Sequence, residues 1–257
     1  MNRPLPSRDQ WLTPEGYARQ EQLLFGQCDV YLRARPATLL KQFAAIGGHH
    51  CDAVGISYQS LLDQDQAFLL SRVIIHIHQT PMSGEMLTLH TWIDGTKGPY
   101  FQRVVQWKNS ADMVVASGRS DWILVSPSNR KIYRPNTVKE SNPLFFSTCD
   151  AALDCPPCQK LTLPKDGTTV IGEHQVRWSE LDGNGHLHSG NYGDIVWDYL
   201  PQPYQSRPVK TFAINYNKEA PLGQTITLTG CAMDDNHYRM EGRTDHGVCF
   251  ESDIVFG

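Results

Sequence analysis

An internal repeat constrains the fold of this chain more than any other feature of its sequence. Residues 71–90, SRVIIHIHQTPMSGEMLTLH, align without gaps with residues 210–229, KTFAINYNKEAPLGQTITLT. The two stretches share identical residues at four positions: Ile75 and Ile214, Gly84 and Gly223, Thr88 and Thr227, and Leu89 and Leu228. Each stretch alternates apolar and polar residues on both sides of a turn, which is typical of two antiparallel strands. The chain is therefore predicted to contain two copies of one β-rich unit.

A helix is predicted upstream of the hairpin in each copy. The first copy has apolar residues at three- and four-residue steps after a candidate N-cap, Thr38, namely Leu39, Leu40, Phe43 and Ile46. The second copy has a shorter set with the same spacing between Gly190 and Pro201, namely Tyr192, Ile195, Val196 and Tyr199. This order of elements predicts an α+β fold in which each helix is buried against one face of an antiparallel sheet.

The segment between the copies is predicted to be a linker, because residues 135–168 contain five prolines and no sustained periodicity. The expected organisation is a first domain over residues 1–138, a linker over 139–168 and a second domain over 169–257. Within the linker, Cys155 and Cys158 together with Cys149 form half of a zinc pattern, but no second pair of ligands follows at zinc spacing. Free thiols are therefore favoured.

Composition excludes several classes of protein. The chain has 257 residues and no apolar run of about 18, the length that spans a membrane. Its start is polar and interrupted by prolines, unlike a signal peptide. The basic residues are not interleaved with aromatic residues as in a nucleic-acid-binding surface. We expect a cytoplasmic protein with no membrane span and no nucleic-acid partner.

Residues 178–192, WSELDGNGHLHSGNY, combine turn residues with reactive side chains. Asp-Gly and Asn-Gly predict a turn, but a turn does not require Asp182, Asn184 and His186 at alternate positions. Metal binding by Asp182, His186 and His188 is an alternative, although no further ligand pair is in view. The stretch is not an EF-hand, because Leu187 stands where that loop needs Gly.

The chain resembles the acyl-[acyl carrier protein] thioesterases, which are built as a tandem, or double, hotdog fold, over roughly residues 20–256. YLRARPATLLKQFAAIGGHHCDAVG (31–55) is similar to the family's first strand and long helix, and GTKGPYFQRVVQW (95–107) to strands that follow. LDGNGHLHSGNY (181–192) is similar to the D-x-N-x-H loop, and YNKEAP (216–221) to the strand that supplies a catalytic Glu. The resemblance implies hydrolysis of acyl-[acyl carrier protein] thioesters, with release of free fatty acids in fatty acid biosynthesis and without a cofactor or metal.

The resemblance also implies a catalytic set, namely Asp182, Asn184, His186 and Glu219. Glu219 is expected to be the general base on water, with His186 as the alternative base or as the proton donor to sulfur. Asp182 would orient or charge His186, and Asn184 would position water or the carbonyl. Oxyanion donors are expected among the backbone N–H groups at the start of the second helix, near Gly190 and Asn191.

Two positions depart from the family pattern. Ala220 stands where plant members commonly have Cys, which excludes a cysteine nucleophile there. The usual Asn-Asn after the motif His is replaced by His188 and Ser189.

Only the second copy is expected to carry out the chemistry. Glu219 aligns with Thr80, and residues 34–37, ARPA, contain no Asp, Asn or His. The first copy is expected to form the acyl-chain pocket and to dock the acidic acyl carrier protein. Its charge fits this role, because residues 30–139 contain 12 Lys and Arg against 7 Asp and Glu, whereas residues 140–257 contain 8 against 16. The residues expected to dock the carrier are Arg33, Arg35, Arg130 and Lys131.

Several alternatives remain open on the sequence. The function could instead be that of a hotdog dehydratase or hydratase acting on acyl thioesters, or of a non-catalytic double hotdog that binds acyl carrier protein. A homodimer, and coenzyme A as the carrier, are also left open. His76 and His78, which alternate along a predicted strand, are interpreted as structural, and His49 and His50 as packing or pocket wall.

Overall fold

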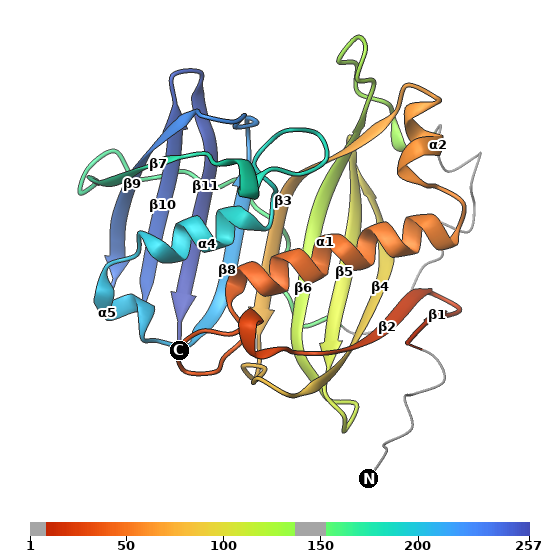
Figure 1. The fold of residues 1–257 in the computed structure, drawn as a ribbon, viewed down its shortest axis with the longest axis horizontal. Coiled ribbons are helices and arrows are strands. Elements are labelled where there is room, and N and C mark those ends of the chain that lie inside the picture. The colour runs from red at the N-terminus through yellow and green to blue at the C-terminus, as the bar shows by residue number, and fades with distance from the viewer. Residues whose placement is uncertain (1–8, 137–152) are drawn as a thin grey trace.

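The strands of both copies form one antiparallel sheet in the computed structural model, which describes residues 9–136 and 153–257 (Figure 1). The first copy contributes β1 (Gln10–Leu12), β2 (Gly16–Gln22), β3 (Ala67–Ile77), β4 (Met86–Lys97), β5 (Tyr100–Lys108) and β6 (Val114–Val125). The second contributes β7 (Thr169–Gln175), β8 (Val209–Tyr216), β9 (Thr225–Asp234), β10 (His237–Thr244) and β11 (Gly247–Phe256). The order across the sheet is β1-β2-β4-β5-β6-β3-β8-β11-β10-β9-β7. The two copies therefore meet at β3 and β8.

The register of β3 and β8 places an approximate twofold axis at the centre of the sheet. Ile74 pairs with Ala213, and the same two residues are equivalent in the ungapped alignment of 71–90 with 210–229. A residue that pairs with its own equivalent lies on the axis that relates the copies. The sequence repeat is therefore also a symmetry of the fold.

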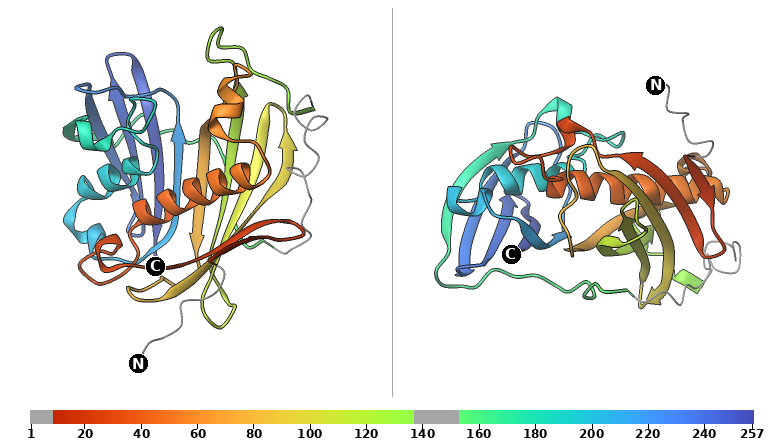
Figure 2. Two further views of the ribbon diagram at one scale, coloured as in Figure 1. Left: turned by 45° about the vertical axis from the view of Figure 1, so that its right-hand side comes forward. Right: turned by 90° about the horizontal axis from the view of Figure 1, so that it is seen from below.

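The helices lie on one face of this sheet (Figures 1 and 2). They are α1 (Pro36–Ala53), α2 (Tyr58–Leu62), α4 (Asn191–Asp198) and α5 (Gln202–Gln205), with 3₁₀ turns η1 (Phe25–Gln27) and η3 (Trp178–Glu180) before α1 and α4. The predicted apolar stripe of α1 is buried in a core that both copies share. Among the described residues, none of the helices has the length and apolar character needed to cross a bilayer.

The predicted N-cap of α1 is wrong. The helix begins three residues earlier, with Arg35 at the N-cap and Pro36 at the first helical position, because the fixed φ of proline suits that position and its missing N–H costs nothing there. Thr38 lies inside the helix, and its hydroxyl donates a hydrogen bond to the carbonyl of Gln27 at 2.6 Å. This bond ties η1 to the first turn of α1.

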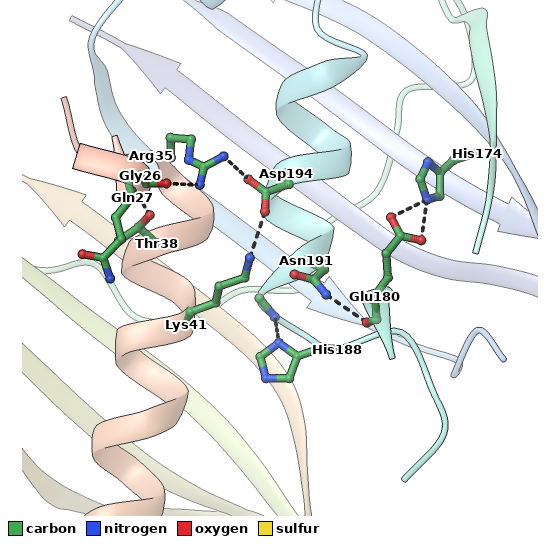
Figure 3. A network of polar contacts seen from close by, with 11 residues as sticks. Gly26, Gln27, Arg35, Thr38, Lys41, His174, Glu180, His188, Asn191 and Asp194 are labelled. Atoms are coloured by element: carbon green, nitrogen blue, oxygen red, sulfur yellow. Dashed lines mark hydrogen bonds and ion pairs between the residues drawn. The ribbon is translucent and has the colours of Figure 1, made fainter. Parts of the chain in front are cut away.

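The two long helices touch at a glycine. A Cβ at Gly193 of α4 would lie 2.8 Å from the Cα of Ala37 in α1, so only glycine permits this approach. Beside this contact, Asp194 of α4 forms ion pairs with Lys41 at 2.9 Å and with Arg35 at 3.5 Å, both from the first copy (Figure 3). The copies are therefore joined both in the helix layer, by α1 and α4, and in the sheet, by β3 and β8.

The described part of the linker, residues 153–168, packs on the opposite face of the sheet from the helices (Figure 2, right). Cys155 and Leu161 are buried there against Ile74 and Ala213, over the approximate twofold axis. Cys155 and Cys158 are free thiols, and burial raises the pKa of Cys155 to about 11 and raises that of Cys158 further. Cys149, the third member of the zinc pattern, lies outside the described residues.

Candidate active site

The D-x-N-x-H loop forms a closed turn between η3 and α4. The Asp182 carboxylate accepts the backbone N–H groups of Asn184 at 2.8 Å and His186 at 3.4 Å, and the Asp182 N–H donates to the His186 carbonyl at 2.9 Å. Gly185 adopts φ +79°, in the left-handed region that favours glycine. Asp182 therefore orients His186 through the backbone of the loop.

A second set of backbone contacts brings this loop beside the turn that follows β8. His186 forms an isolated bridge with Pro221, and the Leu187 N–H donates to the Ala220 carbonyl at 2.9 Å. As a result, Nε2 of His186 lies 3.4 Å from Oε2 of Glu219, with side chains 34% and 60% exposed. Two predicted catalytic residues, 33 positions apart in the sequence, are in ion-pair contact in the fold.

Asn184 points across to the first copy. Its Oδ1 accepts a hydrogen bond from the hydroxyl of Tyr58 at 2.8 Å, and Tyr58 is the first residue of α2. This bond fixes the amide, so that its Nδ2 is left to donate elsewhere. No sequence pattern indicated a role for Tyr58.

A cavity of about 1200 Å³ lies next to Asn184, His186 and Glu219. Most of its wall comes from the first copy, from α1, α2 and strands β3 to β6, and includes apolar residues such as Ile56, Leu61, Phe68, Ile93, Phe101 and Trp122. Reactive side chains of one copy thus border an apolar space built by the other.

The wall of this cavity contains a buried charged side chain. Arg103 of β5 is buried and lines the cavity, and its Nη1 bonds to Thr91 at 3.0 Å and to Nδ1 of His50 at 3.1 Å. Burial, and then the charge of Arg103, lower the pKa of His50 to about 3. His50 is therefore neutral and packs behind the cavity wall.

His188 stabilises the start of α4. Its Nδ1 accepts the Gly190 N–H at 3.0 Å (Figure 3), and its carbonyl accepts the Asn191 N–H at 2.8 Å. Burial lowers the pKa of His188, which favours the neutral ring that can accept a hydrogen bond. The expected oxyanion donors at Gly190 and Asn191 are therefore engaged within the loop, which corrects that prediction. Among the described residues, Asp182, His186 and His188 do not gather into a metal-binding group.

The first copy has the same bend, which begins at Asp29 and not at residues 34–37. Asp29 accepts the backbone N–H groups of Tyr31 and Arg33, each at 2.9 Å, and Arg33 bridges to Met82 as His186 bridges to Pro221. Arg33 thus occupies the position of His186. Residues 29–33 therefore correspond to residues 182–186, and the sequence does not reveal this because the aspartate is the one residue that the two stretches share.

The predicted docking residues fall into two groups. The guanidinium of Arg33 pairs with Asp29 at 2.7 Å, and Arg35 pairs with Asp194 and donates to the Gly26 carbonyl at 2.9 Å. These two arginines make contacts within the protein, and docking by them stays a prediction. Arg130, by contrast, is exposed and lines the cavity, and the neighbouring Lys131 is also exposed.

Comparisons with known proteins define the class. Residues 14–139 match the acyl-ACP thioesterase N-terminal domain, where ACP is acyl carrier protein, and residues 164–252 match the acyl-ACP thioesterase C-terminal domain. The fold is similar to an acyl-ACP thioesterase from Bacteroides thetaiotaomicron, at 18% identity and a TM-score of 0.85 over 93% of this chain and 97% of that one. It is also similar to a 12:0-ACP thioesterase from Umbellularia californica, at 14% identity and a TM-score of 0.79 over 93% and 96%. A search of curated proteins found no match.

The architecture is therefore a tandem hotdog, as predicted. The chain belongs to the acyl-ACP thioesterase family, whose domain matches cover most of its length. It is a thioester hydrolase that cleaves acyl-ACP thioesters and releases fatty acids, which confirms the reaction predicted from the sequence.

Proposed function

We propose that Glu219 is the general base of this hydrolysis and that His186 returns the proton to the leaving group. Glu219 takes a proton from water while the water oxygen bonds to the thioester carbonyl carbon. When the carbon–sulfur bond breaks, the proton passes through His186 to the thiolate, so that a free acid and a thiol leave. The observation that carries this proposal is the 3.4 Å contact between the two side chains beside an apolar cavity.

Asn184 is proposed to supply a hydrogen bond to the carbonyl oxygen. Its Oδ1 is held by Tyr58, which presents the amide Nδ2 as a donor where negative charge develops. Tyr58 then acts as a positioning residue from the first copy. Asp182 takes part only by holding the loop.

The Glu219→Gln and His186→Ala variants test the catalytic assignment. Each should lower kcat by about 100- to 10,000-fold, because a positioned acid or base contributes that much, while circular dichroism shows an unchanged fold. Glu173→Gln, a change at an exposed acid of β7, is the matched control and should retain full activity. Near-normal turnover in both active-site variants would exclude these roles.

The substrate's acyl chain is proposed to lie in the cavity, with the carrier docked beside Arg130 and Lys131. Arg130→Glu and Lys131→Glu should raise KM for an acyl-ACP several-fold and leave KM for a small thioester unchanged, because steering acts on the acidic carrier. Lys165→Glu, at an exposed lysine on the opposite face, controls for net charge. Equal effects on both substrates would rule out docking by these residues.

A role in fatty acid biosynthesis, a cytoplasmic location and the absence of a nucleic-acid partner stay predictions from the sequence, as does the division into residues 1–138, 139–168 and 169–257.

A further inference from the structure

Two histidines and an aspartate meet on the face of the sheet that carries the linker. His76 lies near the end of β3 and His78 just beyond it, both on the outer side, while the alternating residues Ile75 and Ile77 are buried on the helix side. Asp154 comes from the linker. One possible ligand atom from each of the three residues lies within 4.8 Å of the other two.

The spacing of these atoms suits a small divalent ion. Nδ1 of His78 lies 3.7 Å from Oδ2 of Asp154. Two ligands of a tetrahedral zinc ion, each bound at about 2.0–2.2 Å, are separated by about 3.4 Å. A slight movement of the exposed His78 and Asp154 side chains gives them this spacing, and the ligand atom of His76 lies within 4.8 Å of both.

Each imidazole is also held by a hydroxyl through its other nitrogen. Nδ1 of His76 bonds to Oγ1 of Thr211 in β8 at 2.9 Å, which leaves Nε2 as the ligand atom. Nε2 of His78 lies 3.4 Å from Oγ of Ser117 in β6, which leaves Nδ1 on the side of Asp154. Metal-binding histidines generally have such a partner, which fixes the ring and its tautomer.

An ion can reach these residues through a cavity, but a positively charged side chain lies nearby. A cavity of about 450 Å³ beside β3 and β8 is lined by His76, His78 and Lys210. The pKa of His76 is lowered chiefly by burial, then by His78, and also by the charge of the nearby Lys210. Its positive charge should weaken the binding of a cation and strengthen that of an anion, which provides a test.

We propose that His76, His78 and Asp154 bind a divalent transition-metal ion of the zinc class, with water completing the coordination. Imidazole and carboxylate ligands suit such ions. The ion would fasten the linker to β3 on the face opposite the helices. It would stabilise the fold and take no part in thioester hydrolysis, so the proposal does not depend on the assignment of the catalytic residues.

The test uses the full chain with any affinity tag removed. Calorimetric titration with Zn²⁺ should show one site with Kd in the micromolar range or tighter, and Zn²⁺ should raise Tm. His78→Ala and Asp154→Asn, both at exposed positions, should weaken binding by more than about tenfold and abolish the Tm shift. Thr211→Val, which removes only the partner of His76, should weaken it by about tenfold. Lys210→Gln should tighten it roughly threefold by removing a like charge.

His246→Ala is the matched control, because His246 is exposed and its imidazole lies 3.7 Å from a single carboxylate, that of Asp245. It should bind Zn²⁺ like the parent. Substitution with Co²⁺ reports the ligands directly, since visible bands without a sulfur charge-transfer band indicate nitrogen and oxygen ligands. A parent that does not bind Zn²⁺, ligand variants that bind as tightly as the parent, or a sulfur band that disappears in Cys155→Ser would each overturn the proposal.

Discussion

Asp182 and Asp29 perform the same backbone task in the two copies, since each accepts two N–H groups of its own bend. The chemistry of the bend depends on the residue four positions later. His186 faces Glu219 at that position, whereas Arg33 turns back to neutralise Asp29. In the proposed mechanism the carboxylate is thus part of the scaffold, and the imidazole is the group that makes one bend reactive.

This difference predicts the behaviour of Asp182 variants. Asp182→Asn keeps an oxygen that can accept both N–H groups, and kcat should stay within a few-fold of the parent. Asp182→Ala removes the acceptor, and the displaced His186 should lower kcat by about 100-fold. Single-turnover kinetics with an acyl-ACP would measure both. If the two variants lose activity equally, the charge of Asp182 acts on His186 directly.

The family resemblance was sufficient to predict that His186 and Glu219 share one site, and the fold brings their side chains into contact. The sequence could not reveal Tyr58, since the bond to Asn184 joins residues 126 positions apart and exists only when β3 pairs with β8. Nor could it explain His188, whose contact with Gly190 depends on the conformation of the bend.

At the scale of elements, α1 and α4 differ in length but share one close contact. Gly193 allows the backbone of α4 to approach Ala37, and Asp194 then reaches Lys41 and Arg35. The periodicity of both helices could be predicted from sequence, because it reflects burial against the sheet. Their mutual approach could not be predicted. A glycine in a short helix can mark a close contact with another helix or merely lower the stability of the helix, and the sequence does not distinguish the two.

Substitution of two glycines by alanine should therefore have opposite effects. Gly193→Ala should lower the free energy of unfolding by about 1–3 kcal/mol, because its methyl group would overlap the backbone of α1. Gly48→Ala, at an exposed position of α1 where a Cβ meets nothing within 4 Å, should raise it by about 0.5–1 kcal/mol through helix propensity. Urea unfolding compares them. Stabilisation by Gly193→Ala would show that the helices are not in contact.

At the scale of the whole molecule, the stability should depend on pH through buried histidines. The pKa of His50 falls from its usual 6.5 to about 3 on folding, chiefly through burial. Between these values the unfolded chain binds a proton that the folded chain does not, so stability is fully present above pH 6.5 and declines as the pH falls towards 3. His76, His90 and His188 shift in the same direction.

A His50→Gln variant should reduce this acid sensitivity. One titrating group contributes at most about 1.4 kcal/mol per pH unit, and the variant lacks that contribution between pH 6 and pH 4. Urea unfolding at each pH gives the slopes, with His246→Gln, at an exposed position, as the control that should retain the parent's slope. Identical slopes in the parent and His50→Gln would mean that His50 is protonated in the folded protein.

Most of the cavity wall comes from one copy and the reactive side chains come from the other, and this division has a consequence for how such enzymes diversify. The wall residues of the first copy lie between 44 and 132, while His186 and Glu219 stand beyond the linker. The two copies meet at the central strand pair, at the contact between α1 and α4 and at the bond from Tyr58 to Asn184. We therefore predict that exchange of the first half between relatives would change which fatty acid is released and would leave the residues proposed to hydrolyse the thioester unchanged.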